Sequence, residues 1–276
     1  MDAYVIRQVV PTPQDASALL SVEARSLAES PYQPAKIAEI LGWPGQYAYL
    51  AEYGRSPVGF CSCLQVPFQG SPRLEIDLLG VVPEHRGRGV GTRLIEYSVS
   101  EGRRRGVRRF RAIVAQGNEA SLRAFRRAGF FASPRPRAML VYELQGYHAV
   151  DFLPLGWRWR IVPSEAQRVQ LAEDDLAVRG PWEEVHRLWD AQGELVGQGR
   201  CLYVQTLSYR GVWIEDLWAK GAEALRGLGR AVVERAKTLL LDEVGTLWAG
   251  REPLPLLREG YRLVGQYFIL TRSDER

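Results

Sequence analysis

Residues 78–94 read LLGVVPEHRGRGVGTRL: an apolar run, a loop rich in glycine and arginine, then apolar residues at helical spacing. The first turn of a helix leaves backbone N–H groups without intrahelical partners, and the helix dipole adds roughly half a positive charge there. Glycines let the backbone approach an oxygen atom closely, and arginines add charge. The loop and the helix start supply Gly87, Gly89, Gly91, Arg86, Arg88 and Arg93. The stretch therefore predicts a phosphate or pyrophosphate site at the start of a helix.

The spacing of this loop separates it from two other phosphate-binding motifs. It lacks the Gly-Lys-Ser/Thr ending of a Walker loop, and it lacks the G-x-G-x-x-G pattern followed by an acidic residue about twenty positions on. Read with its flanks, the pattern L-x-V-x-P-E-x-R-G-x-G-V-G at residues 79–91 resembles the acetyl-CoA signature of the GNAT superfamily of N-acyltransferases. The stretch NEASLRAFRRAGF at residues 118–130 resembles the second landmark of that family, a helix that ends in Gly-Phe.

The first half of the chain can be read in the order of elements of that family. Residue patterning predicts a strand at 4–10, helices at 15–29 and 34–41 with Asp15 as a cap, and a hairpin of 47–53 and 58–66. A strand at 74–81 leads into the glycine loop and its helix, which runs to about residue 102. A strand at 109–115, a helix at 119–128 and a strand at 138–144 follow.

The second half repeats this order in a weaker form. Strands are expected at 184–191, 195–207 and 211–219, then a helix from 225 to about 242, and closing elements at 246–249, 254–261 and 263–271. Residues 226–231 again match the skeleton R-x-x-G-x-A/G, although the Val-x-Pro lead-in is missing. The expected fold class is α/β (α+β): two tandem GNAT-like domains, 1–146 and 147–276, each a mixed, mostly antiparallel sheet flanked by helices.

Composition limits the class of protein. With 276 residues, 46% hydrophobic and 25% charged, the chain fits two ordinary globular domains. It has no run of eighteen apolar residues and no signal-peptide pattern at its start, so we expect a cytoplasmic protein and no membrane partner. Cys61, Cys63 and Cys201 are expected to be small buried residues rather than a redox or metal site, and the three histidines show no metal-ligand spacing.

Arginine supplies most of the positive charge of this chain, whose formal net charge is +4. Its clusters at 103–105, 108–109, 126–127 and 135–137 could form a nucleic-acid patch or a solvated basic face on helix ends. The aromatic interleaving of single-strand-binding proteins is missing, so we expect no nucleic-acid partner. Part of the excess could hold phosphates of a coenzyme.

Catalysis is assigned to the first half. The second half lacks a counterpart of Asn118, its first helices are compressed into 164–178, and Pro253 and Pro255 shorten its penultimate helix. Seven of the eight tryptophans fall there, either as core and interface packing or, for one or two of them, as substrate-lining residues.

The resemblance implies how the first half would hold acetyl-CoA. In the family, the fourth strand splays from the fifth at a bulge, and backbone N–H groups there bind the pantetheine arm and polarise the thioester carbonyl. Leu79 and Val81 occupy those positions, and Asn118 matches a residue that contacts the pantetheine arm. The pyrophosphate would be held by Arg86, Gly87, Arg88, Gly89, Val90, Gly91 and Thr92. We expect acetyl-CoA as the cosubstrate and no metal.

Acyl transfer to an amine also requires proton transfers. Glu75 matches the glutamate that serves some members as general base, and Asp77 lies two residues on, so both carboxylates are expected on one face of the strand, where repulsion can raise one pKa. The alternative is that both simply face solvent beside the cleft. Phe125, a coenzyme-contact position, stands where many members carry the tyrosine that protonates the leaving thiolate. Water, Tyr97, Tyr142 or no acid at all would serve here.

Two classes of function follow. The favoured one is an N-acetyltransferase that transfers an acetyl group from acetyl-CoA to a primary amine of a small molecule or peptide. The layout also resembles mycothiol synthase, a tandem acetyltransferase in which the second domain does the chemistry. The other class is an acyl-CoA-binding module without turnover, which the phenylalanine at position 125 and the weaker second half would suit.

Overall fold

The structure, a computed structural model, describes residues 4–68, 71–145, 153–163, 181–250 and 253–274. Contacts divide the chain into two compact units. Unit 1 comprises residues 1–136, 205–208 and 268–276, and unit 2 comprises residues 137–204 and 209–267. Within the described residues, no helix combines the length and the apolar character that a membrane span requires.

Unit 1 is built on a mixed sheet with the strand order β1-β2-β3-β4-β5, next to which the end of β13 lies. The neighbouring strands from β1 through β4 pair antiparallel, whereas β4 and β5 pair parallel. The strands are β1 (Val5–Gln8), β2 (Gln46–Tyr53), β3 (Ser56–Phe68), β4 (Ser71–Val81), β5 (Arg109–Ala115), β6 (Phe131–Ala132) and β13 (Arg262–Ser273). The short strand β6 pairs with β13.

A bulge in β4 separates it from β5. Ser62 of β3 pairs with Leu78 and Cys63 pairs with Ile76, so Asp77 is an extra residue in β4. The parallel pairing of β4 with β5 runs only from Arg73 to Ile76. Beyond the bulge, the backbone of residues 78–81 is therefore not paired to β5, although it stays paired to β3.

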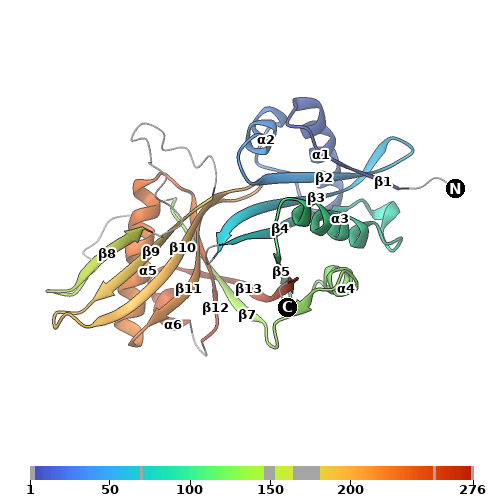
Figure 1. Cartoon of the computed structure of the whole chain (residues 1–276). Helices are drawn as coiled ribbons and strands as arrows, with labels where there is room; N and C mark the ends of the chain where they lie inside the picture. The colour runs from blue at the N-terminus through green and yellow to red at the C-terminus, as the bar shows by residue number, and fades with distance from the viewer. Residues whose placement is uncertain (1–3, 69–70, 146–152, 164–180, 251–252, 275–276) are drawn as a thin grey trace. The chain divides into compact units, whose positions relative to one another are not determined.

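Helices cover both faces of this sheet (Figure 1). They are α1 (Pro13–Ser26), α2 (Pro34–Leu41), η1 (Pro83–His85), α3 (Val90–Arg104) and α4 (Glu119–Arg127). A Cβ added to Gly80 would meet Ser26 of α1, whereas one added to Gly59 would meet Val90 and Leu94 of α3, so α1 and α3 pack on opposite faces. The apolar core between these layers includes Cys61 and Cys63, which are buried as expected.

The start of α1 corrects one prediction. Thr12, not Asp15, is the N-cap, and its side chain accepts a hydrogen bond from the Asp15 N–H. Pro13 occupies the first turn, where its missing N–H and fixed φ are tolerated, so the helix begins two residues earlier than expected. The Asp15 carboxylate instead forms an ion pair with Arg7 at 2.7 Å.

In unit 2 the strand order is β7-β12-β11-β10-β9-β8, and the start of β13 pairs with β7. The strands are β7 (Arg137–Glu143), β8 (Arg158–Pro163), β9 (Trp182–Trp189), β10 (Leu195–Gln205), β11 (Arg210–Ala219) and β12 (Glu243–Trp248). The helices are α5 (Gly221–Thr238) and α6 (Leu254–Arg258). The shortness of α6 agrees with the prediction made from Pro253 and Pro255.

Each unit contains a closing strand from the other half of the chain. β7, which follows the elements of unit 1 in the sequence, belongs to unit 2, and residues 268–276 at the chain end belong to unit 1. The predicted domain boundary at 146/147 and the compressed helices predicted at 164–178 lie outside the described residues. The mixed α/β class with mostly antiparallel sheets is confirmed.

Candidate active site

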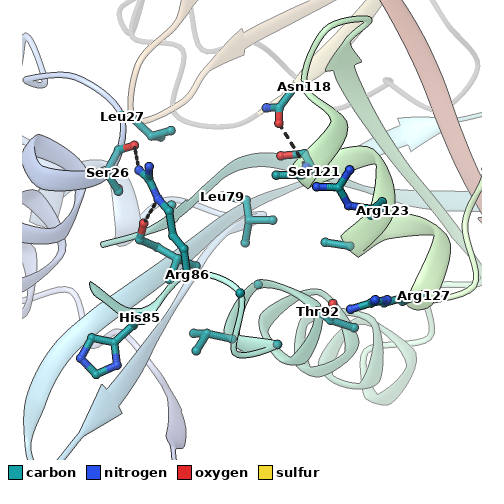
Figure 2. Close-up of a pocket in the computed structure, with 18 residues that line it drawn as sticks. Ser26, Leu27, Leu79, His85, Arg86, Thr92, Asn118, Ser121, Arg123 and Arg127 are labelled. Carbon is teal, nitrogen blue, oxygen red and sulfur yellow. Dashed lines mark hydrogen bonds between the residues drawn. The ribbon is translucent and has the colours of Figure 1, made fainter. Parts of the chain in front are cut away.

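A pocket of about 430 Å³ opens in unit 1 between the splayed end of β4, the start of α3 and one face of α4 (Figure 2). Nine predicted coenzyme residues line it: Leu79, Val81, Arg86, Gly87, Gly89, Val90, Gly91, Thr92 and Asn118. Two further predicted residues, Arg88 and Phe125, are not among its lining. Sequence reasoning missed Ser26, Leu27, Gly80, His85, Ala120, Ser121, Arg123, Ala124 and Arg127, which complete the wall.

The loop before α3 has the backbone that an anion site requires. Gly87 has φ 74° and Gly89, the N-cap of α3, has φ 79°, values that L side chains rarely adopt. No protein atom lies within 4 Å of a Cβ built on either glycine, so the space over the loop is open. The amide groups of Val90, Gly91 and Thr92 form the first turn of α3, where they lack intrahelical acceptors.

The Arg86 side chain joins three segments of the wall. Its Nε donates to the Val81 carbonyl at 2.9 Å and its Nη2 donates to the Ser26 carbonyl at 3.0 Å (Figure 2). The guanidinium therefore ties the loop to the end of β4 and to the end of α1. This bridging role was not expected from the sequence, which indicated only a phosphate contact.

One face of α4 forms the opposite wall (Figure 2). Ala120, Arg123, Ala124 and Arg127 recur at the spacing of neighbouring turns, and both arginines are exposed. This periodicity is a signal that could have found them in the sequence. Asn118 is the N-cap of α4, where its Oδ1 accepts from the Ser121 N–H at 3.1 Å, so its side-chain NH₂ group is the part that can donate to a ligand.

The aromatic positions considered for proton donation lie apart from the pocket wall. Phe125 is buried in the core, with its ring 5.1 Å from that of Phe130 in an edge-to-face contact. Tyr97 packs edge-to-face on Tyr49. Tyr142 belongs to unit 2, where it packs on Tyr261.

Glu75 is held by two guanidinium groups. Its Oε1 forms an ion pair with Arg73, and its Oε2 accepts from Arg111 Nε at 2.7 Å. All three side chains are at most 13% exposed, so this carboxylate is a well-shielded member of an ion-pair network. Both of its oxygen atoms are engaged, which leaves little freedom for accepting a substrate proton.

Asp77, the extra residue of the bulge, differs from Glu75 in its surroundings. It is exposed to solvent, yet the protein atoms around it desolvate the carboxylate enough to raise its pKa to about 6. A hydrogen bond from Thr206 opposes this rise in pKa, and repulsion from Glu75 adds to it. The repulsion expected between the two carboxylates is thus the smaller cause of the raised pKa.

The second-half skeleton at 226–231 lies inside α5, within the helix that the sequence predicted from residue 225, and not in a loop before a helix. β11 ends at Ala219 and α5 begins at Gly221, whereas eight residues separate β4 from α3. Ala224, Leu225, Leu228, Ala231 and Val232 are buried along one face, and this helical pattern extends α5 to a start four residues earlier than expected. Arg226 and Arg230 form ion pairs with Glu259.

Comparison with known proteins relates the part of the chain that carries this pocket to a family model. Residues 17–130 match the model of the acetyltransferase (GNAT) family. A search of curated proteins gave no match. Several solved structures share the whole fold at low identity.

Three of them cover nearly the full chain. A tandem GNAT protein from the clavulanic acid biosynthesis pathway, solved without AcCoA, has a TM-score of 0.58 and 15% identity over 99% of each chain. A GCN5-related N-acetyltransferase from Sphaerobacter thermophilus has a TM-score of 0.59 and 16% identity over 97% of this chain and 95% of that one. A putative acetyltransferase from Pyrococcus horikoshii has a TM-score of 0.57 and 18% identity over 100% and 91%.

Residues 17–130 thus match the GNAT acetyltransferase family model, and the chain as a whole has the fold of a tandem GNAT protein. Members of that family use an acyl-CoA thioester, and the residues of the pocket in this chain fit one. The positive-φ glycines leave open space for a pyrophosphate, and the unpaired β4 backbone next to Leu79 offers hydrogen-bonding groups to a pantetheine arm. Arg123 and Arg127 supply positive charge on the facing helix.

Proposed function

We propose that unit 1 transfers an acetyl group from acetyl-CoA to a primary amine of a small molecule or peptide. The single observation that carries the proposal is that one pocket is lined both by the open glycine loop and by the β4 residues beyond the bulge. The loop supports binding of a pyrophosphate, and the bulge exposes backbone where an acyl carbonyl would be polarised. A cytoplasmic location remains an expectation.

The chain's own groups would divide the work as follows. The amide groups at the start of α3 hold phosphate oxygens, and Arg86 keeps that loop fixed to β4 and α1. The Leu79 and Val81 backbone orients the carbonyl of the thioester, which supplies an activated acyl group when it is bound. Asn118 fixes the start of α4 and donates to the same arm.

Between the two predicted carboxylates, the surroundings favour Asp77 as the base. Glu75 is neutralised by Arg73 and Arg111, whereas Asp77 is exposed and has a pKa of about 6, near the pH at which the reaction would run. We expect Asp77→Asn to lower kcat by about a hundred-fold or more, since general base catalysis contributes about 10²- to 10⁴-fold. Glu75→Gln, which removes only a positioning charge, should cost less.

A coenzyme-binding module without turnover is the second candidate. It is favoured by Phe125, which has no proton to donate and lies buried in the core. The second unit is not proposed as the catalytic one, because the skeleton at 226–231 is part of α5.

Thiol release from acetyl-CoA, measured across a panel of small primary amines and amino-terminal peptides, tests the proposal. The account predicts amine-dependent release that saturates with at least one acceptor and that Asp77→Asn suppresses. Binding of acetyl-CoA by calorimetry without release for any amine would favour the binding module instead.

A further inference from the structure

The pocket wall that α4 forms changes in character along the helix. At its start, the N-cap Asn118 offers an uncharged amide, and the small side chains of Ala120 and Ala124 follow. Arg123 and Arg127 also line the pocket, and Arg127 lies in the last turn of α4. Nine residues of helix, about 13.5 Å along the axis, separate Asn118 from Arg127. A ligand that extends along α4 therefore passes from an uncharged end of this wall to a positively charged end.

The protein does not neutralise these two guanidinium groups. Among the described residues, Arg123 and Arg127 form no ion pair and no side-chain hydrogen bond, and Glu119, four residues before Arg123, does not pair with it. Arginines of another cluster behave differently, since Arg103 pairs with Asp274 at 2.6 Å. Like charges one turn apart on a helix repel each other. The two exposed arginines therefore present a doubly positive surface that an anionic ligand would stabilise.

This surface faces the start of α3, since α4 packs against α3. Figure 2 shows Arg127 extending from α4 toward Thr92, in the first turn of α3, and Arg123 extending into the pocket. The backbone amides of that first turn are the groups that would hold a pyrophosphate. The arginines of α4 thus lie across the pocket from the pyrophosphate position and add charge that the amides alone do not supply.

Coenzyme A carries a third phosphate group, a monoester on the 3′ oxygen of its ribose. Each phosphate of the pyrophosphate has one negative charge, whereas a phosphate monoester has about 1.5 to 2 at neutral pH. Two guanidinium groups match the charge of the monoester, and the planar fork of an arginine binds phosphate oxygens through paired hydrogen bonds. Of the three phosphates, the monoester is therefore the best match for the two arginines.

We propose that Arg123 and Arg127 bind the 3′-phosphate of coenzyme A and thereby select free acyl-CoA as the acyl donor. The inference rests on the proposed function, in which unit 1 binds acetyl-CoA. An acyl group on the phosphopantetheine arm of a carrier protein brings neither the adenosine nor its 3′-phosphate. Such a donor would leave the two arginines without a ligand, so the site discriminates against it.

Calorimetric titration with coenzyme A and with 3′-dephospho-coenzyme A tests this inference without turnover. The variants are Arg123→Gln, Arg127→Gln and the double variant. Arg126→Gln is the matched control, because Arg126 is an exposed arginine of the same helix that does not line the pocket, and its loss changes the net charge equally. A thermal melt of each variant checks that it is folded, and a titration with 4′-phosphopantetheine represents the arm of a carrier protein.

We expect the parent protein to bind coenzyme A about a hundred-fold more tightly than the dephospho form, since each arginine contributes about ten-fold through charge-assisted hydrogen bonds. Each single variant should lose about ten-fold of that preference and the double variant nearly all of it, whereas the control keeps it. Affinities for dephospho-coenzyme A and for 4′-phosphopantetheine should hardly change in any variant.

Equal affinities of the parent protein for the two coenzymes would overturn the inference. So would variants that lose affinity equally for both coenzymes, because the arginines would then contact the pyrophosphate. If the parent protein binds neither coenzyme, the inference and the proposed function fail together. If the preference depends on the two arginines but no amine gives thiol release, the inference is supported and only the transfer reaction fails.

Discussion

At the scale of single residues, the buried carboxylate of Glu23 makes stability depend on pH. Its pKa is about 7 in the folded protein against an ordinary value of 4.5, so the folded state binds the proton more tightly than the unfolded state does. The favourable contribution is complete below about pH 4.5 and is lost as the pH rises through 7. A shift of this size corresponds to roughly 3 kcal/mol.

We therefore expect Glu23→Gln to have a higher free energy of unfolding than the parent protein at pH 8, by up to about 3 kcal/mol, with a smaller difference or none at pH 5. Urea melts at the two pH values measure this. If the free energy of unfolding changes by the same amount in both proteins between pH 5 and pH 8, the account of Glu23 as a buried, titrating carboxylate is contradicted.

Arg86 is the second residue whose role the structure changes. Because its guanidinium bonds two backbone carbonyls, Arg86→Ala should loosen the loop as well as remove charge, and the affinity for coenzyme A should fall by about ten- to one-hundred-fold. Arg88→Ala is the matched control, since Arg88 is exposed and does not line the pocket. Calorimetry on both variants should show the larger loss for Arg86. Equal losses would mean that both act only through charge.

The sequence predicted those parts of the fold and site that depend on local, periodic patterns of residues. It found the glycine loop, the strand before it and the helix after it, because the positive-φ glycines and the apolar spacing of 78–94 are fixed by neighbours in the chain. It could not find Glu23, because burial of that side chain depends on the sheet packed against α1. The hydrogen bond from Arg86 to Ser26 joins residues 60 positions apart and leaves no local pattern.

At the scale of elements, α5 shows how a matching motif can serve packing. Gly229 lies in a tight contact, since an added Cβ would come within 2.8 Å of Leu256, and its carbonyl accepts from the Tyr261 hydroxyl at 3.2 Å. The skeleton R-x-x-G-x-A/G describes both this helix and the loop of unit 1, and only the preceding residues separate them. The helix predicted from the sequence began at residue 225, because the motif was given more weight than the helix-forming residues 222–225 before it.

Gly229→Val should lower the free energy of unfolding by about 1–3 kcal/mol through overpacking, with no change in the affinity of the protein for acetyl-CoA. Ala222→Val, at an exposed position of the same helix, measures the cost of the β-branched side chain alone. Denaturant melts and calorimetry give both quantities. Loss of coenzyme binding in a folded Gly229→Val protein would argue for a second coenzyme site in α5.

At the scale of the whole molecule, the end of the chain completes unit 1. Leu270 is fully buried and pairs with Ala132, and Asp274 forms an ion pair with Arg103 at 2.6 Å. The exchange of closing strands between the halves was not predictable from the sequence, because either closing strand has a suitable pattern for either sheet.

Leu270→Ala should therefore cost about 2–5 kcal/mol of stability and should weaken acetyl-CoA binding only as far as unit 1 unfolds. Exposed Leu263 of the same strand provides the control, and Leu263→Ala should change stability little. Thermal melts with and without acetyl-CoA would separate a loss of stability from a loss of coenzyme binding. A Leu270→Ala protein as stable as Leu263→Ala would contradict the placement of the chain end in the core of unit 1.

The central claim is that the glycine loop of unit 1 binds acetyl-CoA, and one calorimetric comparison tests it most directly. Gly89 and Gly106 lie at opposite ends of α3 with φ values of 79° and 82°, and a Cβ on either meets no atom within 4 Å. The strain of a valine is therefore matched between the two positions. The account predicts that Gly89→Val weakens acetyl-CoA binding at least ten-fold, whereas Gly106→Val leaves it unchanged. Equal affinities for the two variants would contradict it.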